Sequence, residues 1–486
     1  MVFSYYISKE QINIPELPQH RRFGDFNIAF DAVTPFYMAE KENFSAAVFG
    51  FAIDLFTGCG GDLTGDILDK CSDISDLLEF EKKIGGKYLI LFRIDKQYYL
   101  LGDATCSIPV YYTSEGEAVC TSNPEFLVKR FGFQPDPLLN HIRQSGDISQ
   151  AMPFDITHYR EIMSLLPNHI LNICQQAASR FINSDCPQKK LTVKEATDKA
   201  LPLIQTLSDF YSGIYRIYCP ITGGRDSRVV MSFLNGKTKH KTPSYTIRHK
   251  NFRDDDTDLT IPAQLCASVG IPYTQICDEE LSESIIGLAD HLLGKGCYSQ
   301  RTLQIAETIR THYGDGAVIN GDIIGQVGKC SLHRDIPSCF ATPAYFRCKL
   351  HNYSDEAKKQ LKLWIDEIKD SGEKINVFDL FSIENRMGRW AGQENLVYNS
   401  IGQPYLNVFN SRSIIYLWTA VSRKERKTGK IQKALIERVF PELLETPYGT
   451  GSSKLNGFAK KTGMTYLAAS YIKYYTGKKK FMKNCK

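Results

Sequence analysis

The stretch of sequence that decides the fold reads Ile214-Tyr-Arg-Ile-Tyr-Cys-Pro-Ile221, then Thr222-Gly-Gly-Arg-Asp-Ser227, then Arg228-Val-Val-Met-Ser-Phe-Leu234. The first part predicts an apolar strand, the second a tight glycine turn, and the third a helix that opens on an aspartate and a serine. Such a turn directs unpaired backbone N–H groups and a helix N-terminus toward one point in space. Because the amides and the helix dipole both favour an anion, the segment predicts a phosphate site.

The residues of the turn have separate expected roles. Gly223 and Gly224 allow the backbone to approach a phosphate closely. Asp226 is an anion like the phosphate, so we expect it to hold Mg²⁺, a hard cation that prefers oxygen ligands, against the phosphates. The spacing differs from that of the Walker loop, which has a longer interval between its glycines and a lysine. The alternative is a glycine turn that only joins a strand to a helix.

Strands and helices alternate around this segment. We expect helices over 193–207, 258–269, 281–293 and 302–313, with Gly270 ending the second, and strands over 243–247, 271–277 and 317–320. This alternation predicts an α/β fold with a parallel sheet and helices on both faces. Ligands of parallel sheets bind at the carboxyl ends of the strands. The turn at 222–227, Thr246 and residues 320–322 all fall at such ends, so the sequence predicts one shared site.

The first part of the chain has a different pattern. Short apolar or aromatic runs predict strands over 46–52, 87–92, 98–101, 109–112 and 117–121, with turns at 85–86, 95–96 and 114–116. Helices are expected near 74–83 and 137–144, which makes this part α+β. The polar stretch 183–190 predicts a linker between two domains, 1–185 and 191–486. The second domain is expected to be mostly helical from residue 355 onward.

Composition narrows the class of protein. The 486 residues are 43% hydrophobic and 23% charged, as in ordinary soluble globular proteins. A net charge of +5 is small for this length, so nucleic acid is not expected as a partner. The chain shows no apolar run long enough for a membrane span, no signal-peptide pattern, and no Cys-x-x-Cys pair among its 14 cysteines. These features predict a cytoplasmic protein in a reducing compartment, without a zinc site.

The glycine turn resembles the Ser-Gly-Gly-x-Asp-Ser pyrophosphate loop of ATP pyrophosphatases, with Thr222 in place of the first serine. The chain as a whole resembles the asparagine-synthetase-like family. Further segments that look like those of the family are the helix start at Asp258, the turn at Gly321, Arg386, the stretch 404–407, and the region 441–454 with Lys454 at its end. Members of this family use ATP to turn a carboxylate into an acyl-adenylate, release pyrophosphate and pass the acyl group to nitrogen.

The first domain resembles the glutaminase-type domain of that family, an Ntn-hydrolase-like sandwich, over 86–92, 101–103, 109–112 and 166–171. Glutaminase members use a cysteine at position 2 as an N-terminal nucleophile. Here position 2 is Val2, and none of the first 58 residues is cysteine. We therefore expect a degenerate domain without glutaminase activity, with nitrogen supplied by ammonia or an amine. Lasso-peptide cyclases and β-lactam synthetases, which are relatives within the resemblance, also lack that activity.

The chain departs from the family pattern at its second glycine turn. Asparagine synthetases read Ser-Gly-Glu-Gly-x-Asp-Glu there, whereas 320–326 reads Asn-Gly-Asp-Ile-Ile-Gly-Gln. Asp322 stands at the glutamate position, and Gly325 replaces an aspartate expected to bind a metal ion. Ser400 replaces another family glutamate, so we expect the acceptor pocket to differ from one for aspartate. The variant loop looks like that of members from bacterial polysaccharide gene clusters, thought to amidate sugar acids, which indicates a small-molecule or sugar carboxylate.

The resemblance assigns expected site residues. Those expected to contact ATP are Ile221, Thr222, Gly223, Gly224, Asp226, Ser227, Thr246 and Gly321, with Asp226 also holding Mg²⁺. Those expected to act in catalysis are Asp322 as a base or orienting group, Lys454 as a neutralising charge, and Arg225 as a phosphate partner. Arg228, Arg386 and Glu394 are further candidates.

Each of these residues has a structural alternative. Arg225 and Arg228 are equally compatible with surface charge at a helix start, and Thr246 with an ordinary strand residue. Asp258 is expected to cap its helix, and Asp322 is compatible with a turn aspartate.

Three functions remain open at the level of sequence. The first is an ATP-dependent ligase that joins a small or sugar carboxylate to ammonia or an amine. The second is a macrolactam cyclase of the lasso-peptide type, in which the amine belongs to the substrate itself. The third is a non-catalytic scaffold that binds nucleotide, which the absent cysteine and the absent metal aspartate favour.

Overall fold

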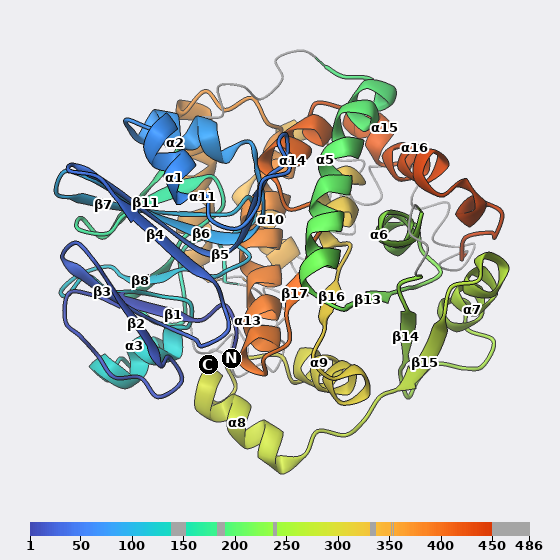
Figure 1. The fold of residues 1–486 in the computed structure, drawn as a ribbon, viewed down its shortest axis with the longest axis horizontal. Helices are drawn as coiled ribbons and strands as arrows, with labels where there is room; N and C mark the ends of the chain where they lie inside the picture. Colours follow the sequence, from blue (N-terminus) through green and yellow to red (C-terminus); the bar gives the residue numbers. More distant parts are fainter. Residues whose placement is uncertain are drawn as a thin grey trace.

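The computed structural model describes residues 1–137, 152–181, 190–236, 241–330, 337–350, 352 and 354–449. The first part of the chain forms two antiparallel six-stranded sheets, and the second part forms one parallel five-stranded sheet (Figure 1). The expected succession of an α+β part and an α/β part is confirmed at this level. The helix expected near 137–144 and most of the expected linker lie outside the described residues.

The two antiparallel sheets combine strands from across the first 180 residues. One has the order β10-β8-β9-β1-β3-β2 and consists of β1 (Tyr5–Ser8), β2 (Gln19–Phe23), β3 (Phe26–Phe30), β8 (Tyr111–Thr113), β9 (Cys120–Thr121) and β10 (Ile162–Ser164). The other has the order β12-β11-β7-β6-β5-β4 and consists of β4 (Phe36–Glu40), β5 (Phe44–Asp54), β6 (Ile84–Ile94), β7 (Gln97–Gly102), β11 (His169–Asn172) and β12 (Ala177–Arg180).

Successive side chains of a strand point to opposite faces of its sheet, so each sheet can pack on the other sheet with one face and on helices with the other. Along β5, Ala46 and Val48 pack in the cluster that includes α1 (Thr64–Lys70) and α2 (Ile74–Glu81). The intervening Ala47 and Phe49 belong to the cluster between the two sheets. Helix α3 (Pro124–Phe131) covers the outer face of the other sheet through Phe126 and Leu127. The layers are therefore helix, sheet, sheet and helix (Figure 1).

One expected turn of the first part is wrong. Gly85 and Gly86 lie inside β6, opposite Ile53 and Ala52 of β5, rather than in a hairpin. Gly86 has φ +136°, and a Cβ there would collide with the carbonyl oxygen of Phe51. Gly86 is thus required by close contact between two backbones. The turns expected at 95–96 and 114–116 are confirmed, because they join β6 to β7 and β8 to β9.

The parallel sheet has the order β15-β14-β13-β16-β17. Its strands are β13 (Ile217–Pro220), β14 (Ser244–Arg248), β15 (Tyr273–Cys277), β16 (Ala317–Ile319) and β17 (Tyr405–Leu406). All of its pairings are parallel, as the alternation predicted. The sequence did not predict β17, which joins the sheet from a distant part of the chain.

Helices cover both faces of this sheet. Those of the second part are α5 (Val193–Ile214), α6 (Asp226–Asn235), α7 (Thr257–Val269), α8 (Glu283–Leu293), α9 (Gln300–Tyr313), α10 (Pro343–Leu350), α11 (Asp355–Asp370), α12 (Val377–Leu380), α13 (Gly392–Ser400), α14 (Arg412–Thr419), α15 (Arg423–Arg426) and α16 (Lys430–Val439), with π-helical segments η1 (Ile324–Gly328) and η4 (Phe381–Ala391) and short 3₁₀ turns η3 (Ser338–Phe340) and η5 (Pro441–Leu444). Residues of α9 and α13 pack on one face with Tyr218 and Val318. Residues of α5, α6 and α16 pack on the other with Ile217 and Cys219.

Buried ion pairs join the two parts of the chain. Arg412 Nε lies 2.5 Å from Glu81 Oε2, and Arg180 Nη1 lies 2.6 Å from Glu384 Oε1. Arg412, Glu81 and Glu384 are buried, so each charge depends on its partner. Within the described ranges, no helix has both the length and the apolar character needed to cross a bilayer.

Candidate functional site

The glycine turn lies at the carboxyl end of β13, between the strand and α6. The amide of Ile221 donates to the carbonyl of Tyr245 at 2.8 Å, and the hydroxyl of Thr246 donates to the carbonyl of Ile221 at 2.6 Å. The sequence analysis placed Thr246 at the end of a strand. In the structure β14 continues to Arg248, so Thr246 lies inside the strand. Its buried side chain anchors the start of the turn.

Hydroxyl groups hold the turn together from inside. The amide of Thr222 donates to Ser227 Oγ at 3.2 Å, and the amide of Gly224 donates to Thr222 Oγ1 at 3.3 Å. The two hydroxyl oxygens, Thr222 Oγ1 and Ser227 Oγ, lie 3.2 Å apart. Thr222 and Gly224 are exposed, whereas Gly223 between them is buried. The turn therefore presents Thr222 and Gly224 outward.

Gly223 connects the turn to α7. Its amide donates to Asp258 Oδ1 at 2.9 Å, and a Cβ at this position would lie 2.9 Å from the carbonyl oxygen of Thr257. The cap expected at Asp258 is wrong: Asp256 is the N-cap of α7 and accepts from the amide of Asp258. Asp258 is thus free to bind the turn. The amide of Gly223 is occupied by this bond.

Among the residues that the structure describes, no side chain caps the N-terminus of α6. Its neighbour α7 is capped by Asp256, which satisfies an amide of the first turn. An uncapped helix N-terminus leaves amides that can donate hydrogen bonds to an anion. The helix begins at Asp226, next to the exposed Gly224, so these amides border the outward side of the turn.

The two arginines of the turn have different environments. Arg228 is buried and donates to the carbonyl oxygens of Leu443, Thr446 and Pro447 at 3.0, 2.6 and 2.8 Å. These bonds give it a structural role. Arg225 is partly exposed and donates to the carbonyl of Thr428 at 2.6 Å through Nη1. A guanidinium has further donors, so Arg225 is able to pair with a phosphate as well.

The carboxylate of Asp226 is engaged on both oxygens. Oδ1 accepts from Gln432 Nε2 of α16 at 3.0 Å, and Oδ2 lies 3.4 Å from the ammonium of Lys329. Gly325 of η1 lies beside it, because a Cβ at that position would be 3.2 Å from Oδ2. Among the described residues, no three His, Cys, Asp or Glu side chains form a group able to hold a metal ion. The surroundings of Asp226 are those of an ion pair.

The second glycine turn, at the end of β16, packs against the first. A Cβ at Gly321 would lie 3.4 Å from the carbonyl carbon and oxygen of Asp226. Asn320 Oδ1 accepts from the amide of Asp322 at 3.1 Å and from Asn407 Nδ2 at 2.6 Å. The structure therefore brings together the turns at 222–227 and 320–322, as the strand ends predicted.

Asp322, Arg386, Glu394 and Tyr405 form a half-buried polar cluster beside this turn. Its Oδ2 accepts from the hydroxyl of Tyr405 at 3.3 Å. Burial raises the pKa of the Asp322 carboxyl, and Asp226 raises it further, whereas Tyr405 and Arg386 lower it. Burial and the charge of Asp322 raise the pKa of the Glu394 carboxyl well above its usual value. The cluster thus holds two carboxyls that keep their protons to higher pH than in water.

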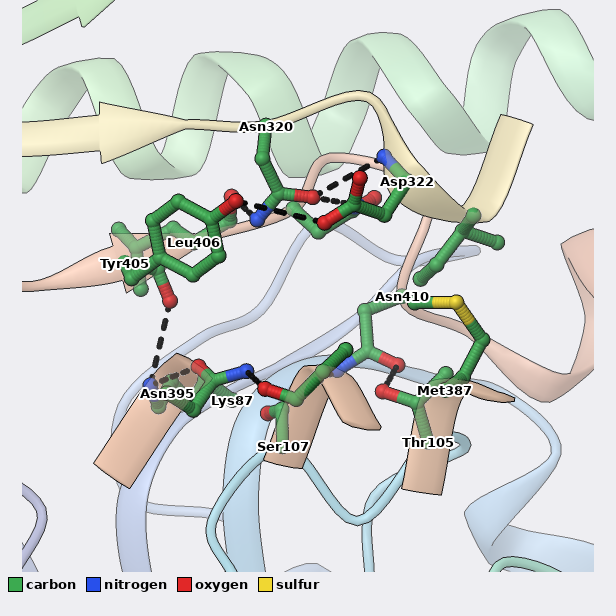
Figure 2. A pocket seen from close by; sticks show the side chains of 13 residues that line it. Lys87, Thr105, Ser107, Asn320, Asp322, Met387, Asn395, Tyr405, Leu406 and Asn410 are labelled. Atoms are coloured by element: carbon green, nitrogen blue, oxygen red, sulfur yellow. Dashed lines mark hydrogen bonds between the residues drawn. The ribbon is translucent and has the colours of Figure 1, made fainter. Parts of the chain in front are cut away.

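A small cavity of about 20 Å³ lies beside Asp322, between the two parts of the chain. Figure 2 shows Asn320, Asp322 and Tyr405 on one wall, with Lys87 on the other. The ammonium of Lys87, from β6, donates to Asn395 Oδ1 at 2.6 Å, to Asn399 Oδ1 at 3.1 Å and to the carbonyl of Tyr405 at 3.1 Å. Burial lowers its pKa to about 7.

Sequence reasoning missed several residues of this region. Those that the structure adds are Lys87, Lys329, Asn395, Asn407, Asn410 and Gln432. A lysine at the start of the apolar run 87–92 was a usable signal, because charged residues are rarely buried without a specific partner. Lys454 lies outside the described residues. Comparison with known protein families and with curated proteins finds no match for this chain.

Proposed function

We propose that this protein is an ATP-dependent ligase that forms an amide bond. The acid is a small-molecule or sugar carboxylate, and the nitrogen comes from ammonia or an amine. In the first step a carboxylate oxygen attacks the α-phosphorus of ATP, the bond to the bridging oxygen breaks, and pyrophosphate leaves. In the second step the nitrogen attacks the acyl carbon, AMP leaves, and the nitrogen loses a proton to a base.

The observation that carries this proposal is the meeting of the two glycine turns. The uncapped N-terminus of α6 and the exposed Thr222 and Gly224 support a phosphate site at the end of β13. Gly321 packs within van der Waals contact of Asp226, so the end of β16 borders the same site. A phosphate chain bound at the first turn and a carboxylate bound at the second would lie close together, and such proximity lowers the entropic barrier to their reaction.

The described residues suit particular steps. Arg225 retains donors for the pyrophosphate as its charge develops. Asp322, with its raised pKa, suits a base that takes the proton from the attacking nitrogen. Ile221 and Thr246 support the turn, and Ser227 links its two ends through Thr222. Lys454 keeps its role by resemblance alone.

The donor set around Asp226 does not fit a protein-held Mg²⁺ site. The cation prefers six oxygen ligands, with one or two carboxylates among them. Here the position facing Asp226 is Gly325, and both carboxylate oxygens face donor groups. We therefore derive no step through the metal ion.

The layers of the first domain support the resemblance to the asparagine-synthetase-like family. Two stacked antiparallel sheets with outer helices are the arrangement that the glutaminase-type resemblance implies. We infer that it serves the ligase as a structural partner, because Lys87 reaches across to the helix that carries Glu394 and Asn395.

The test is pyrophosphate release from ATP in the presence of a panel of sugar acids and other small carboxylates, each with ammonium or an amine. We expect a subset of acids to give release, and the Asp226→Ala variant to lose most of it. The matched control is Asp255→Ala, an exposed aspartate near α7. Full activity in Asp226→Ala would contradict the proposal. ATP binding without release for any acid would favour the nucleotide-binding scaffold, which the glycine at position 325 supports.

A further inference from the structure

Gly325 leaves the carboxylate of Asp226 without an acidic neighbour on η1. A Cβ at position 325 would lie 3.2 Å from Asp226 Oδ2 and 3.5 Å from Cγ, so any side chain there would point at this carboxylate. An aspartate would place two carboxylates side by side, and such a pair is stable only with a shared proton or a cation between them. With glycine, that requirement disappears.

Lys329 places a cation at the same carboxylate. It follows Gly325 by four residues and directly follows η1, and its Nζ lies 3.4 Å from Asp226 Oδ2. This distance exceeds the roughly 2.7–2.9 Å of a close charged hydrogen bond. An ammonium has three donors, so Lys329 keeps capacity for a second anion. Its side chain is 22% exposed, which leaves it open on one side.

Gln432 fixes the orientation of the Asp226 carboxylate that faces Lys329. Its Nε2 donates to Asp226 Oδ1 at 3.0 Å and to the carbonyl of Ile324 at 3.2 Å. Gln432 is buried, so the amide ties α16, α6 and η1 together at one point. Asp226 is thereby oriented with Oδ2 toward Lys329. Because Asp226 is the first residue of α6, Lys329 lies beside the uncapped N-terminus of that helix.

We propose that the ammonium of Lys329 supplies the positive charge for phosphates bound at the 222–227 turn, in place of a metal ion held between two carboxylates. The inference rests on the proposed ATP site. It specifies that Asp226 is a positioning residue for Lys329 and that the site accepts the nucleotide without a divalent cation. A fixed ammonium and helix amides together provide the anion site.

The experiment measures ATP binding to the full chain by titration calorimetry, once with a chelator and once with excess Mg²⁺. We expect wild type to bind in both conditions. Lys329→Met is expected to lower the affinity for metal-free ATP about tenfold or more, since one charge-assisted hydrogen bond is lost. The matched control is Lys433→Met on α16, a lysine whose ammonium pairs with Glu437, and it should bind as wild type does.

The outcomes separate this inference from the proposed function. Binding by wild type only when Mg²⁺ is present would overturn the role of Lys329 and leave the ATP site standing. So would equal losses in Lys329→Met and Lys433→Met. Absence of ATP binding in both conditions would overturn both. The wild-type comparison needs no variant and stands even if Lys329→Met fails to fold.

A second variant tests whether the Lys329 ammonium takes the place of Mg²⁺. Gly325→Asp combined with Lys329→Met restores a facing carboxylate and removes the ammonium. We expect this double variant to bind ATP about tenfold more tightly with Mg²⁺ than with the chelator. Metal-independent binding by the double variant would contradict the inference.

Discussion

Asp258, the second residue of α7, accepts a hydrogen bond from the backbone amide of Gly223 at 2.9 Å. This bond joins the glycine turn to a helix that begins 34 residues after it, and it holds the turn in a fixed position over the sheet. A carboxylate that accepts a backbone N–H is a strong, charge-assisted acceptor. The position of the turn therefore depends on an acidic residue outside it.

Replacing Asp258 should loosen the turn. Asp258→Ala is expected to lower the free energy of unfolding by about 1–2 kcal/mol and to weaken ATP binding about fivefold or more, because the amide of Gly223 loses its acceptor. Asp256→Ala is the matched comparison, since it removes the cap of the same helix and should cost about 1 kcal/mol without weakening binding. Urea titrations and calorimetry measure both quantities, and equal ATP affinities in the two variants would refute the anchoring role.

The two arginines of the turn should separate stability from function. Arg228→Met removes three hydrogen bonds from a buried guanidinium to backbone carbonyls and is expected to destabilise the protein by about 3 kcal/mol or more. Arg225→Met affects a partly exposed side chain and should cost under about 1 kcal/mol. Its pyrophosphate release should nevertheless fall about tenfold, since a phosphate partner is lost. Unchanged release by a folded Arg225→Met would exclude that arginine from the reaction.

Lys87 should make stability depend on pH. Burial lowers its pKa in the folded protein to about 7 from an ordinary value of 10.5. Between these values the unfolded chain binds more protons, so this lysine makes the free energy of unfolding rise with pH, by at most about 1.4 kcal/mol per unit. Below pH 7 the folded protein carries the full penalty of the buried charge.

The measurement compares wild type with Lys87→Met by urea denaturation from pH 6.5 to 9.5. The difference in unfolding free energy between them should grow in favour of wild type as the pH rises. Lys41→Met, which affects an exposed lysine paired with Asp69, should show no such trend. A constant difference across the range would show that Lys87 stays charged in the folded protein, held by its three oxygen acceptors.

Asp322 should set the acidic limb of the activity profile. In the proposed reaction Asp322 acts as a base in its ionised form, so kcat/KM should rise as the pH increases through its raised pKa. Tyr405→Phe removes a hydrogen bond that lowers this pKa, so the limb should move to higher pH. Because Glu394 titrates in the same cluster, the limb reports the pair of carboxyls. Tyr398→Phe keeps the Tyr405 hydroxyl and should leave the limb in place; a shift to lower pH in Tyr405→Phe would contradict the assignment.

Local sequence was sufficient for part of the site. β13, the glycine turn and α6 depend on neighbouring residues, and so do the ends of β13 and β16 that meet at Gly321. The expected strand start at Ile214 is wrong, because α5 extends to Ile214 and β13 begins at Ile217. Hydrophobic periodicity predicted the parallel sheet because its period distinguishes strands from helices. Val2 and Gly325 were visible as departures from a family pattern, but their neighbours were not.

The rest depended on contacts between distant residues. Nothing local to Gly86 indicated a strand, because the reason for glycine is the backbone of Phe51 on another strand. β17 joins the sheet 86 positions after β16, and no periodicity predicts such a partner. Asp256 and Asp258 both fit the pattern of a cap, and only the position of Gly223 distinguishes their roles.

The sequence alone determined that a glycine turn followed by a helix stands at the end of a parallel strand, since turn chemistry and periodicity are local properties. Only the tertiary structure decided what surrounds Asp226, because Gly325, Lys329 and Gln432 reach it from two segments that lie 99 to 206 residues further along the chain. Side-chain partners across such separations are set by how helices pack, and packing is a property of the whole fold.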